Sequence, residues 1–355
     1  MTLDSAARQH QLPTDGYTIT IHEHIADIAT EWDYQANRHD FLNSQFLQAL
    51  EDAPPSGTDF RYVYLYKDNV IQDILYYQIK KIALYRSLRL DTYHPTKIGD
   101  KVWHSIKSFF AKMLNANILV NGNMTLTGNH GSSMNGLTID NYNIIAECNQ
   151  IVVDHLKAHS GIKVKAILIK DFYEKCKGED LGYTHFEVQP NMICQIDPAW
   201  QSFEDYTGAM KSKYRVRVNR ARKKADTLTR RLLDLNDIKQ LEGDISRLYN
   251  NVANQAGFNL FILPDDYFHS LKRHLRDRID IYGYFDEMSN MVGFYTSIKN
   301  GKDIDAHFLG YDTTCNKRCQ LYLNMLYDLV ENAIHCGANE LVLSRTALEI
   351  KSSIG

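Results

Sequence analysis

The sequence IDIYGYFDEMSNMVGFYTSIKNGKDIDAHFLGY, residues 279–311, contains three strand-like runs separated by tight turns. Residues 279–285, 291–298 and 303–311 are rich in aromatic and β-branched side chains, which favour strands. The connections between the runs are short, so neighbouring strands are expected to pair in antiparallel fashion. These residues therefore predict the centre of an antiparallel sheet in the second half of the chain.

A long amphipathic helix is predicted directly after these strands. Its apolar residues recur at helical spacing and share one face: Tyr322, Met325, Leu326, Leu329, Val330 and Ala333. Gly337 is placed to cap the helix, and residues 340–344 form a further short strand. A final helix begins after Thr346, which is suited to cap it.

Working outward, the first half of the chain has a similar order of elements. Strands are predicted at residues 17–22, 60–66, 70–83, 116–120 and 164–169, with helices at 25–35, 41–51, 101–114 and 140–159. One domain type used twice accounts for both halves. We expect a disordered leader at 1–15, an N-terminal domain at 16–197 and a C-terminal domain at 198–355.

Composition indicates a compact globular protein. Of the 355 residues, 44% are apolar and 23% are charged, and the formal net charge of -3 does not indicate a general nucleic-acid binder. No apolar run is long enough to span a membrane, and the first residues lack the apolar centre of a signal peptide. Six scattered cysteines are expected to be reduced, which favours a cytoplasmic location. Cys315 and Cys319 are the only closely spaced pair, and no metal site is predicted.

Two segments carry a family resemblance. Residues 210–225 look like the basic helix that opens the second domain in tandem-GNAT proteins. Residues 306–311, 321–324 and 344–355 resemble the closing strand, helix and basic Thr-Ala-x-x-x-Lys pattern of the same proteins. The chain therefore resembles the tandem-GNAT N-acyltransferases of the FemAB-like or CelD-like branch, which implies an α/β (α+β) fold of two mixed, mostly antiparallel sheets flanked by helices. A complete GNAT domain has two further strands after its last helix, and this sequence ends within that helix.

The resemblance implies an enzyme of peptidoglycan or polysaccharide biosynthesis in the cell envelope. We expect an N-acyltransferase that moves an acyl group from an acyl thioester, coenzyme A in particular, to a small-molecule amine by direct attack. Two alternatives remain open: a Fem-type transferase that uses aminoacyl-tRNA, and a non-catalytic GNAT-like binding module. Fem-type proteins often insert a long charged helical hairpin for tRNA, and its absence from the sequence favours the thioester donor.

Amide formation needs a base for the proton of the amine and a donor for the departing group. Asp305 and His307 are two residues apart on a predicted strand, so both side chains are expected on one face of the sheet. They are the candidate bases, with a polar pair on a wet sheet face as the alternative. Tyr322 is the candidate acid, although its position on the apolar stripe equally suits a core tyrosine.

Three positions are candidates for binding anions. In the turn at residues 310–320, free N–H groups at the start of the long helix would hold a donor pyrophosphate beside Asn316, Lys317 and Arg318. The usual glycine-rich signature of acyl-CoA enzymes is absent from that turn. In the first half, the glycine-containing loop at 128–136 is a weaker phosphate candidate, and His130 within it is either a base or a plain loop residue.

The third position is the basic segment 211–224, which has eight cationic residues and no acid. On a helix, its apolar stripe would pack on a sheet and leave Lys213, Arg217 and Arg220 to bind substrate phosphate; the alternative is a solvated face. Arg345 and Lys351 match basic positions of the family pattern, which implies contacts to an anionic substrate.

Overall fold

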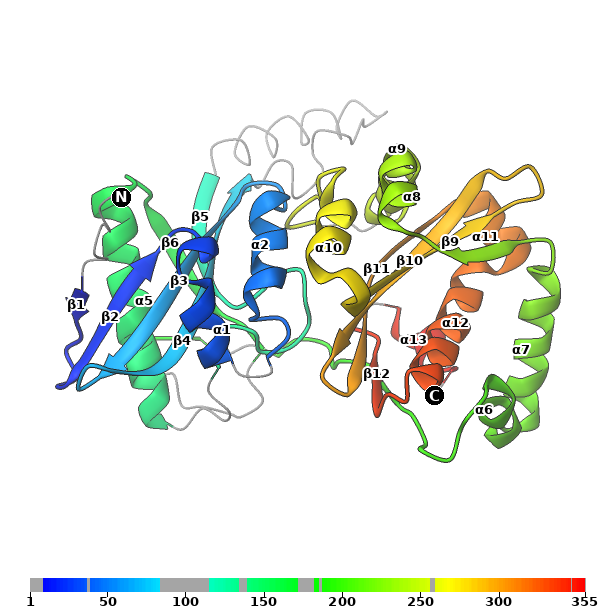
Figure 1. Cartoon of the computed structure of the whole chain (residues 1–355), viewed down its shortest axis with the longest axis horizontal. Helices are drawn as coiled ribbons and strands as arrows, with labels where there is room; N and C mark the ends of the chain where they lie inside the picture. The colour runs from blue at the N-terminus through cyan, green and yellow to red at the C-terminus, as the bar shows by residue number, and fades with distance from the viewer. Residues whose placement is uncertain are drawn as a thin grey trace, which may run out of the picture. The chain divides into compact units, whose positions relative to one another are not determined.

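The computed structural model describes residues 9–36, 39–83, 115–133, 139–171, 182–184, 187–255, 259–345 and 347–354. The chain forms two compact units, which are coloured from blue to green and from green to red in Figure 1. The first unit contains Met1–Glu187 and Gly257–Leu263, and the second contains Val188–Ala256 and Pro264–Gly355. The expected boundary at residue 198 is too late, because the strand at Ile193–Gln195 already pairs within the second unit.

The first unit has a six-stranded sheet in the order β1-β2-β3-β4-β5-β6. Its strands are β1 (Gln9–Gln11), β2 (Tyr17–His22), β3 (Thr58–Lys67), β4 (Val70–Ala83), β5 (Asn115–Asn121) and β6 (Val164–Ile169). Its helices are η1 (Ile25–Asp27), α1 (Ala29–Ala36), α2 (Ser44–Asp52) and α5 (Ile139–His159). The expected disordered leader is wrong for residues 9–11, because β1 pairs with β2. The predicted helix at 101–114 lies outside the described residues.

In the first unit, β5 and β6 are parallel and remain paired to the end of β5. Their register runs from Asn117 opposite Val164 to Asn121 opposite Ile169, and Lys170 N then donates to Asn121 O at 3.1 Å. The connection between them includes α5, whose buried residues join the core of the sheet. This pair of strands has no opening along its described length.

The second unit also has a six-stranded sheet, in the order β7-β12-β11-β10-β9-β8. Its strands are β7 (Ile193–Gln195), β8 (Thr229–Leu232), β9 (Ile279–Phe285), β10 (Met291–Asn300), β11 (Asp303–Tyr311) and β12 (Glu340–Val342). Its helices are α6 (Phe203–Ala209), α7 (Ser212–Lys224), α8 (Leu235–Gln240), α9 (Glu242–Ala253), α10 (Tyr267–Leu275), η3 (Arg276–Arg278), α11 (Thr313–Cys319), α12 (Leu321–His335) and α13 (Leu348–Lys351). Both sheets are mixed and flanked by helices, so the predicted fold class is confirmed.

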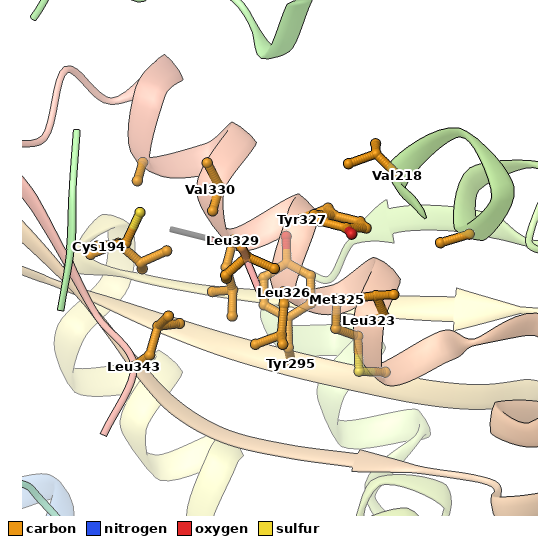
Figure 2. Close-up of a cluster of buried hydrophobic side chains, with 14 of the residues drawn as sticks. Cys194, Val218, Tyr295, Leu323, Met325, Leu326, Tyr327, Leu329, Val330 and Leu343 are labelled. Atoms are coloured by element: carbon orange, nitrogen blue, oxygen red, sulfur yellow. The ribbon is translucent and has the colours of Figure 1, made fainter. Parts of the chain in front are cut away.

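Helices cover the second sheet on both faces. The stripe of α12 packs on one face together with α6 and α7, and Val218 of α7 and Tyr327 of α12 belong to this core (Figure 2). On the other face, Phe294 of β10 meets Phe268 of α10 edge-on. Gly310 of β11 allows α9 to lie close to this face, since a Cβ atom at Gly310 would be 2.5 Å from the Tyr249 nitrogen. Val218 and Ala221 are the buried residues of α7, as its apolar stripe predicts.

The parallel strands β11 and β12 part soon after they meet. Only two residue pairs join them, Ile304 with Leu341 and Asp305 with Val342, whereas β11 continues to Tyr311. Beyond Asp305, this edge of β11 has no strand partner in the described part of the chain. The β11–β12 opening, as we call this region, therefore begins at Asp305 and includes residues 306–311.

The outer edge of β12 is covered by a strand from earlier in the chain. Cys194 of β7 lies opposite Leu341, and the pairing extends through Leu343 N to Met192 O at 2.8 Å. The resemblance placed two further strands after the last helix of a GNAT domain. Here β7 lies beside β12, so the sheet is closed on that side by the segment that enters the unit.

Candidate active site in the second unit

Asp305 lies at the start of the β11–β12 opening and is 8% exposed. It is opposite Ile298 of β10, and Asn300 Nδ2 donates to its Oδ2 at 3.2 Å. Burial raises the pKa of the carboxyl group to about 7, the bond from Asn300 opposes this rise, and the charge of Asp303 adds to it. A carboxyl group with this pKa exchanges its proton near neutral pH, as a general base must.

His307 is surrounded by aromatic side chains. Its Nε2 and the Tyr267 hydroxyl are hydrogen-bonded at 2.8 Å, and the two rings are stacked. Burial lowers the pKa of the imidazole to about 3, so the ring is neutral at neutral pH. His307 is therefore a much weaker base than Asp305. Its contact with Tyr267 holds the middle of β11 against α10.

The two candidate bases lie on the same face of the sheet, as the two-residue spacing predicts. Asp305 is opposite Ile298, which is on the same face as Phe294, while His307 contacts Tyr267 of α10. A bulge follows, because His307 and Phe308 together face Thr296 of β10. The Thr296 hydroxyl donates to Phe308 O and accepts from Phe308 N, which holds the bulge in place.

Tyr322 is not brought together with the two bases. Its ring packs near that of Tyr311, among residues that contact the α12 core on the other face of the sheet. Burial raises the pKa of its hydroxyl, so the phenol stays protonated. Tyr322 and Asp305 therefore flank β11 from opposite faces, and burial makes the Tyr322 hydroxyl a weaker acid.

The predicted turn at residues 310–320 is mostly helical. Residues 313–319 form α11, and Gln320 has a left-handed backbone (φ 51°) before α12 begins. Asp312 Oδ1 accepts from Cys315 N at 2.7 Å, and Asn316 Oδ1 accepts from Tyr322 N at 2.8 Å. Asn316 thus caps α12, a different role from the predicted contact with a cofactor. Lys317 and Arg318 are exposed on α11, close in sequence to the end of β11.

The predicted phosphate wall is a helix with an exposed cationic face. On α7, Lys213 and Arg220 are exposed and Arg217 is half-buried. Lys213 Nζ lies 4.6 Å from the centre of the Tyr214 ring. Arg217 and Arg222 both lower the pKa of the Tyr327 hydroxyl, although burial raises it more.

Arg345 and Lys351 have different environments. Arg345 is half-buried just after Ser344, which has a left-handed backbone (φ 63°). Lys351 is 5% exposed, and its ammonium group donates to Leu343 O. Burial lowers the pKa of Lys351 to about 8. Lys351 therefore ties α13 to the end of β12, and its contact with an anionic substrate stays a prediction. Thr346 lies outside the described residues.

A second polar cluster lies on the α12 face of the sheet. A pocket of about 550 Å³ is bounded by α6, α7, α12, β8 and β9. At its base, Asp328 is 3% exposed and accepts from Arg222 and from the Tyr284 hydroxyl. Arg230 Nη1 lies 3.1 Å from Asp328 Oδ1 and 3.3 Å from Glu331 Oε2.

Sequence reasoning missed this cluster, although a signal was present. Asn324, Asp328 and Glu331 recur at i, i+4 and i+7 on an otherwise apolar helix, which places a polar stripe beside the core. Arg230 has no comparable signal, because it meets the stripe only after β8 joins the sheet. The same holds for Tyr267, which approaches His307 only in the folded unit.

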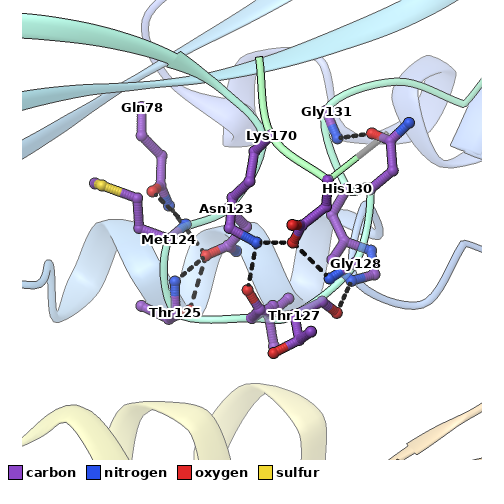
Figure 3. Close-up of polar contacts among 12 residues, drawn as sticks. Gln78, Asn123, Met124, Thr125, Thr127, Gly128, His130, Gly131 and Lys170 are labelled. Atoms are coloured by element: carbon purple, nitrogen blue, oxygen red, sulfur yellow. Dashed lines mark hydrogen bonds and ion pairs between the residues drawn. The ribbon is translucent and has the colours of Figure 1, made fainter. Parts of the chain in front are cut away.

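The glycine-containing loop of the first unit is held by its own side chains and by residues that follow β6 (Figure 3). Gly128 N donates to Asp171 Oδ2 at 2.9 Å, and Lys170 Nζ donates to Leu126 O at 2.7 Å. His130 Nε2 lies 3.0 Å from Thr127 O, and burial lowers the pKa of its ring to about 4. These three groups therefore already have protein partners, and the described part of the loop ends at residue 133.

Metal ligands and membrane-spanning helices are both absent from the described residues. Among them, no three His, Cys, Asp or Glu side chains are grouped to hold a metal ion. None of the helices in the described part of the chain has the length and apolar character needed to cross a bilayer.

Comparison with solved structures identifies the fold. FemX is similar with a TM-score of 0.50 and 13% sequence identity, over 90% of this chain and 87% of FemX. N-myristoyltransferase of Saccharomyces cerevisiae with bound myristoyl-CoA has a TM-score of 0.48 and 10% identity, over 95% of this chain and 75% of that protein. A tandem GNAT protein from the clavulanic acid biosynthesis pathway has a TM-score of 0.45 and 8% identity, over 88% of this chain and 83% of that protein. No protein-family model and no curated protein matches the sequence. The likeness to FemX shows that this chain shares its fold, and the two mixed sheets flanked by helices are the fold class that the sequence predicts.

Proposed function

We propose that this protein is an N-acyltransferase whose reaction takes place at the β11–β12 opening of the second unit. The observation that carries the proposal is the end of strand pairing at Asp305 and Val342. At this point β11 separates from β12, and the nearly buried carboxyl group of Asp305 has a pKa of about 7. Among the described residues of the first unit there is no such arrangement, because β5 and β6 stay paired to the end of β5.

The reaction is a direct transfer. The neutral amine attacks the carbonyl carbon of the thioester, the C–N bond forms and the C–S bond breaks. Ionised Asp305 takes the proton that the amine loses, and the departing thiolate takes a proton from Tyr322 or from solvent. Those backbone N–H groups of residues 306–311 that point away from β10 are proposed to bind the developing oxyanion, because this edge of β11 has no strand partner in the described chain.

The donor is proposed to be an acyl thioester of coenzyme A. Lys317 and Arg318 are exposed on α11, directly after the strand that borders the opening, where cations would bind the phosphates of the donor. Within the described residues of the second unit, no helix is longer than the 15 residues of α12, so a long charged hairpin for tRNA is absent there. A FemAB-like role in building a cell-envelope precursor is part of the proposal.

A second candidate is transfer from aminoacyl-tRNA. It is favoured by the segment at residues 211–224, which includes α7, has eight cations and exposes most of them. A helix with this charge binds a polyanion without reading its sequence. The fold likeness to FemX is compatible with either donor.

Calorimetry with acetyl-CoA and with charged tRNA tests the choice of donor. Binding of acetyl-CoA at micromolar to millimolar concentration, followed by release of free thiol when amines are added, would support the thioester. Binding of charged tRNA alone would replace the thioester by the second candidate. Absence of transfer with both donors would leave a binding module and contradict the proposed activity.

A further inference from the structure

We propose that the pocket between α6, α7 and α12 is a binding site for a phosphate group, separate from the β11–β12 opening. The pocket is lined by α6, α7, α12, β8 and β9, so it lies near the β8 edge of the sheet. The opening lies between β11 and β12, and β10 separates these strands from β9. The inference goes beyond the proposed transfer reaction and does not depend on it.

Two guanidinium groups converge at the base of this pocket. Arg222 and Arg230 both reach Oδ1 of Asp328, and the Tyr284 hydroxyl bonds its Oδ2. Asp328 is nearly fully buried, so its partners must hold it by charge and hydrogen bonds. The buried Asp328 carboxylate therefore holds the guanidinium groups of Arg222 and Arg230 close to each other.

Both guanidinium groups keep donors for a ligand. Each arginine has five N–H donors, and the contacts of Arg230 with Asp328 and Glu331 are all made by Nη1. The side chains of Arg222 and Arg230 are 33% and 32% exposed, and both line the pocket. Aligned guanidinium forks suit the oxygens of a phosphate, which offers more acceptors than a carboxylate does.

Glu331 occupies the position that a ligand anion would take. Its Oε2 is 3.3 Å from Arg230 Nη1 and 3.8 Å from Arg222 Nη2, and its side chain is 41% exposed. These long, exposed contacts contribute little stability, so the carboxylate can turn outward at small cost. A phosphate dianion that displaces Glu331 gains contacts with both guanidinium groups.

The surroundings add positive charge. Arg222 is on α7, whose other cations are Lys213, Arg215, Arg217, Arg220, Lys223 and Lys224, and Lys211 directly precedes the helix. Glu204 is the remaining acid of the pocket lining and is exposed on α6. The lining itself holds two arginines and three acids, so any excess of positive charge comes from the cations of α7 outside the lining, and a volume of about 550 Å³ suits a ligand of nucleotide size.

Inorganic pyrophosphate, titrated calorimetrically into the full chain at fixed ionic strength, tests the proposal. Glu331→Gln removes the resident carboxylate and should lower the Kd severalfold. Arg230→Ala should raise the Kd by roughly tenfold or more, as expected for the loss of a charge-assisted contact. Lys224→Ala is the matched control, since Lys224 is an exposed cation of α7 outside the pocket lining, and it should change the Kd by less than about twofold.

Further probes identify the source of the phosphate and expose a wrong assignment. Tighter binding of AMP than of pyrophosphate would support a nucleotide, and the reverse order would support a free diphosphate. An equal rise of the Kd for pyrophosphate in Arg230→Ala and Lys224→Ala would mean that pyrophosphate binds to the general positive charge of α7. That result would overturn the site. Binding of the diamine putrescine that is lost in Glu331→Gln would assign the pocket to a cation and would also overturn it.

Discussion

Asp305 and Val342 form the last residue pair between β11 and β12, and the two strands separate beyond them. A parallel pair normally continues while both strands remain extended, yet β12 ends here and β11 runs on to Tyr311. The separation exposes one backbone edge of β11 beside a nearly buried carboxyl group. In the first unit, Asn121 at the end of β5 still pairs with Ile169. The proposed entry point of the acyl donor, a separation of two parallel strands, is therefore seen between β11 and β12 and not between β5 and β6.

Replacing Asp305 tests the base directly. Asp305→Asn keeps the shape of the side chain and removes the ability to accept the amine proton, so kcat should fall by about 10²–10⁴-fold. The Kd for acetyl-CoA should change little, because no contact with the donor is assigned to this side chain. Steady-state kinetics and calorimetry on the same variant measure both quantities. An unchanged kcat would remove Asp305 from the mechanism.

The pH profile of transfer follows from the pKa of Asp305. The ionised carboxylate is the base, so kcat/KM should rise with pH and level off above about 7. The charge of Asp303 raises this pKa, so Asp303→Asn should move the rise to lower pH while the plateau stays similar. His307→Ala serves as the comparison, since a group with a pKa of about 3 cannot produce a rise near neutral pH. A profile in Asp305→Asn that still rises near pH 7 would contradict the assignment.

Lys351 should make stability depend on pH. Its pKa is about 8 in the folded unit and 10.5 for an unperturbed lysine, so the unfolded chain binds more protons between these values. The free energy of unfolding should therefore gain a contribution as pH rises from about 8 to 10.5. Lys351→Met lacks this contribution, so its destabilisation relative to the wild type should grow over the same range. Urea unfolding at pH 7 and pH 9.5 measures the difference, and a smaller difference at pH 9.5 would contradict the burial of a neutral amine.

Asp328 should matter far more for stability than Glu331 does. Asp328→Ala leaves the guanidinium groups of Arg222 and Arg230 without their shared buried partner, and the expected loss is about 3 kcal/mol. Glu331→Gln removes only long and exposed contacts, so the expected loss is below about 1 kcal/mol. Urea denaturation of the two variants compares the losses. Equal losses would mean that Asp328 does not anchor the cluster.

The sequence predicts the sheets well because their signals are local. Strands β6, β9 and β11 have the predicted bounds, and the α12 stripe lies in the core as its spacing requires. The left-handed Gly337 (φ 63°) follows α12 where the cap is expected. These features depend on residues that are close in sequence, so hydrophobic period and turn chemistry are sufficient to find them.

The site is less predictable because its contacts join distant segments. The bond between Tyr267 and His307 spans 40 residues, and the bond between Arg222 and Asp328 spans 106. The strand at Ile193–Gln195 is too short to signal that it completes the sheet beside β12. Sequence alone does not predict that Lys351 is buried, because nothing in its neighbouring residues indicates burial. Residue types suggested the chemistry, but only the folded unit determines which groups meet.

Hydrogen–deuterium exchange with saturating acetyl-CoA tests the central claim most directly. The proposed donor site predicts slower exchange of the amides in residues 306–311 and 343–345, with little change in residues 117–121 and 164–169 of the first unit. Slower exchange confined to the first unit, or no change at residues 306–311 when binding is saturated, would contradict a donor site at the β11–β12 opening.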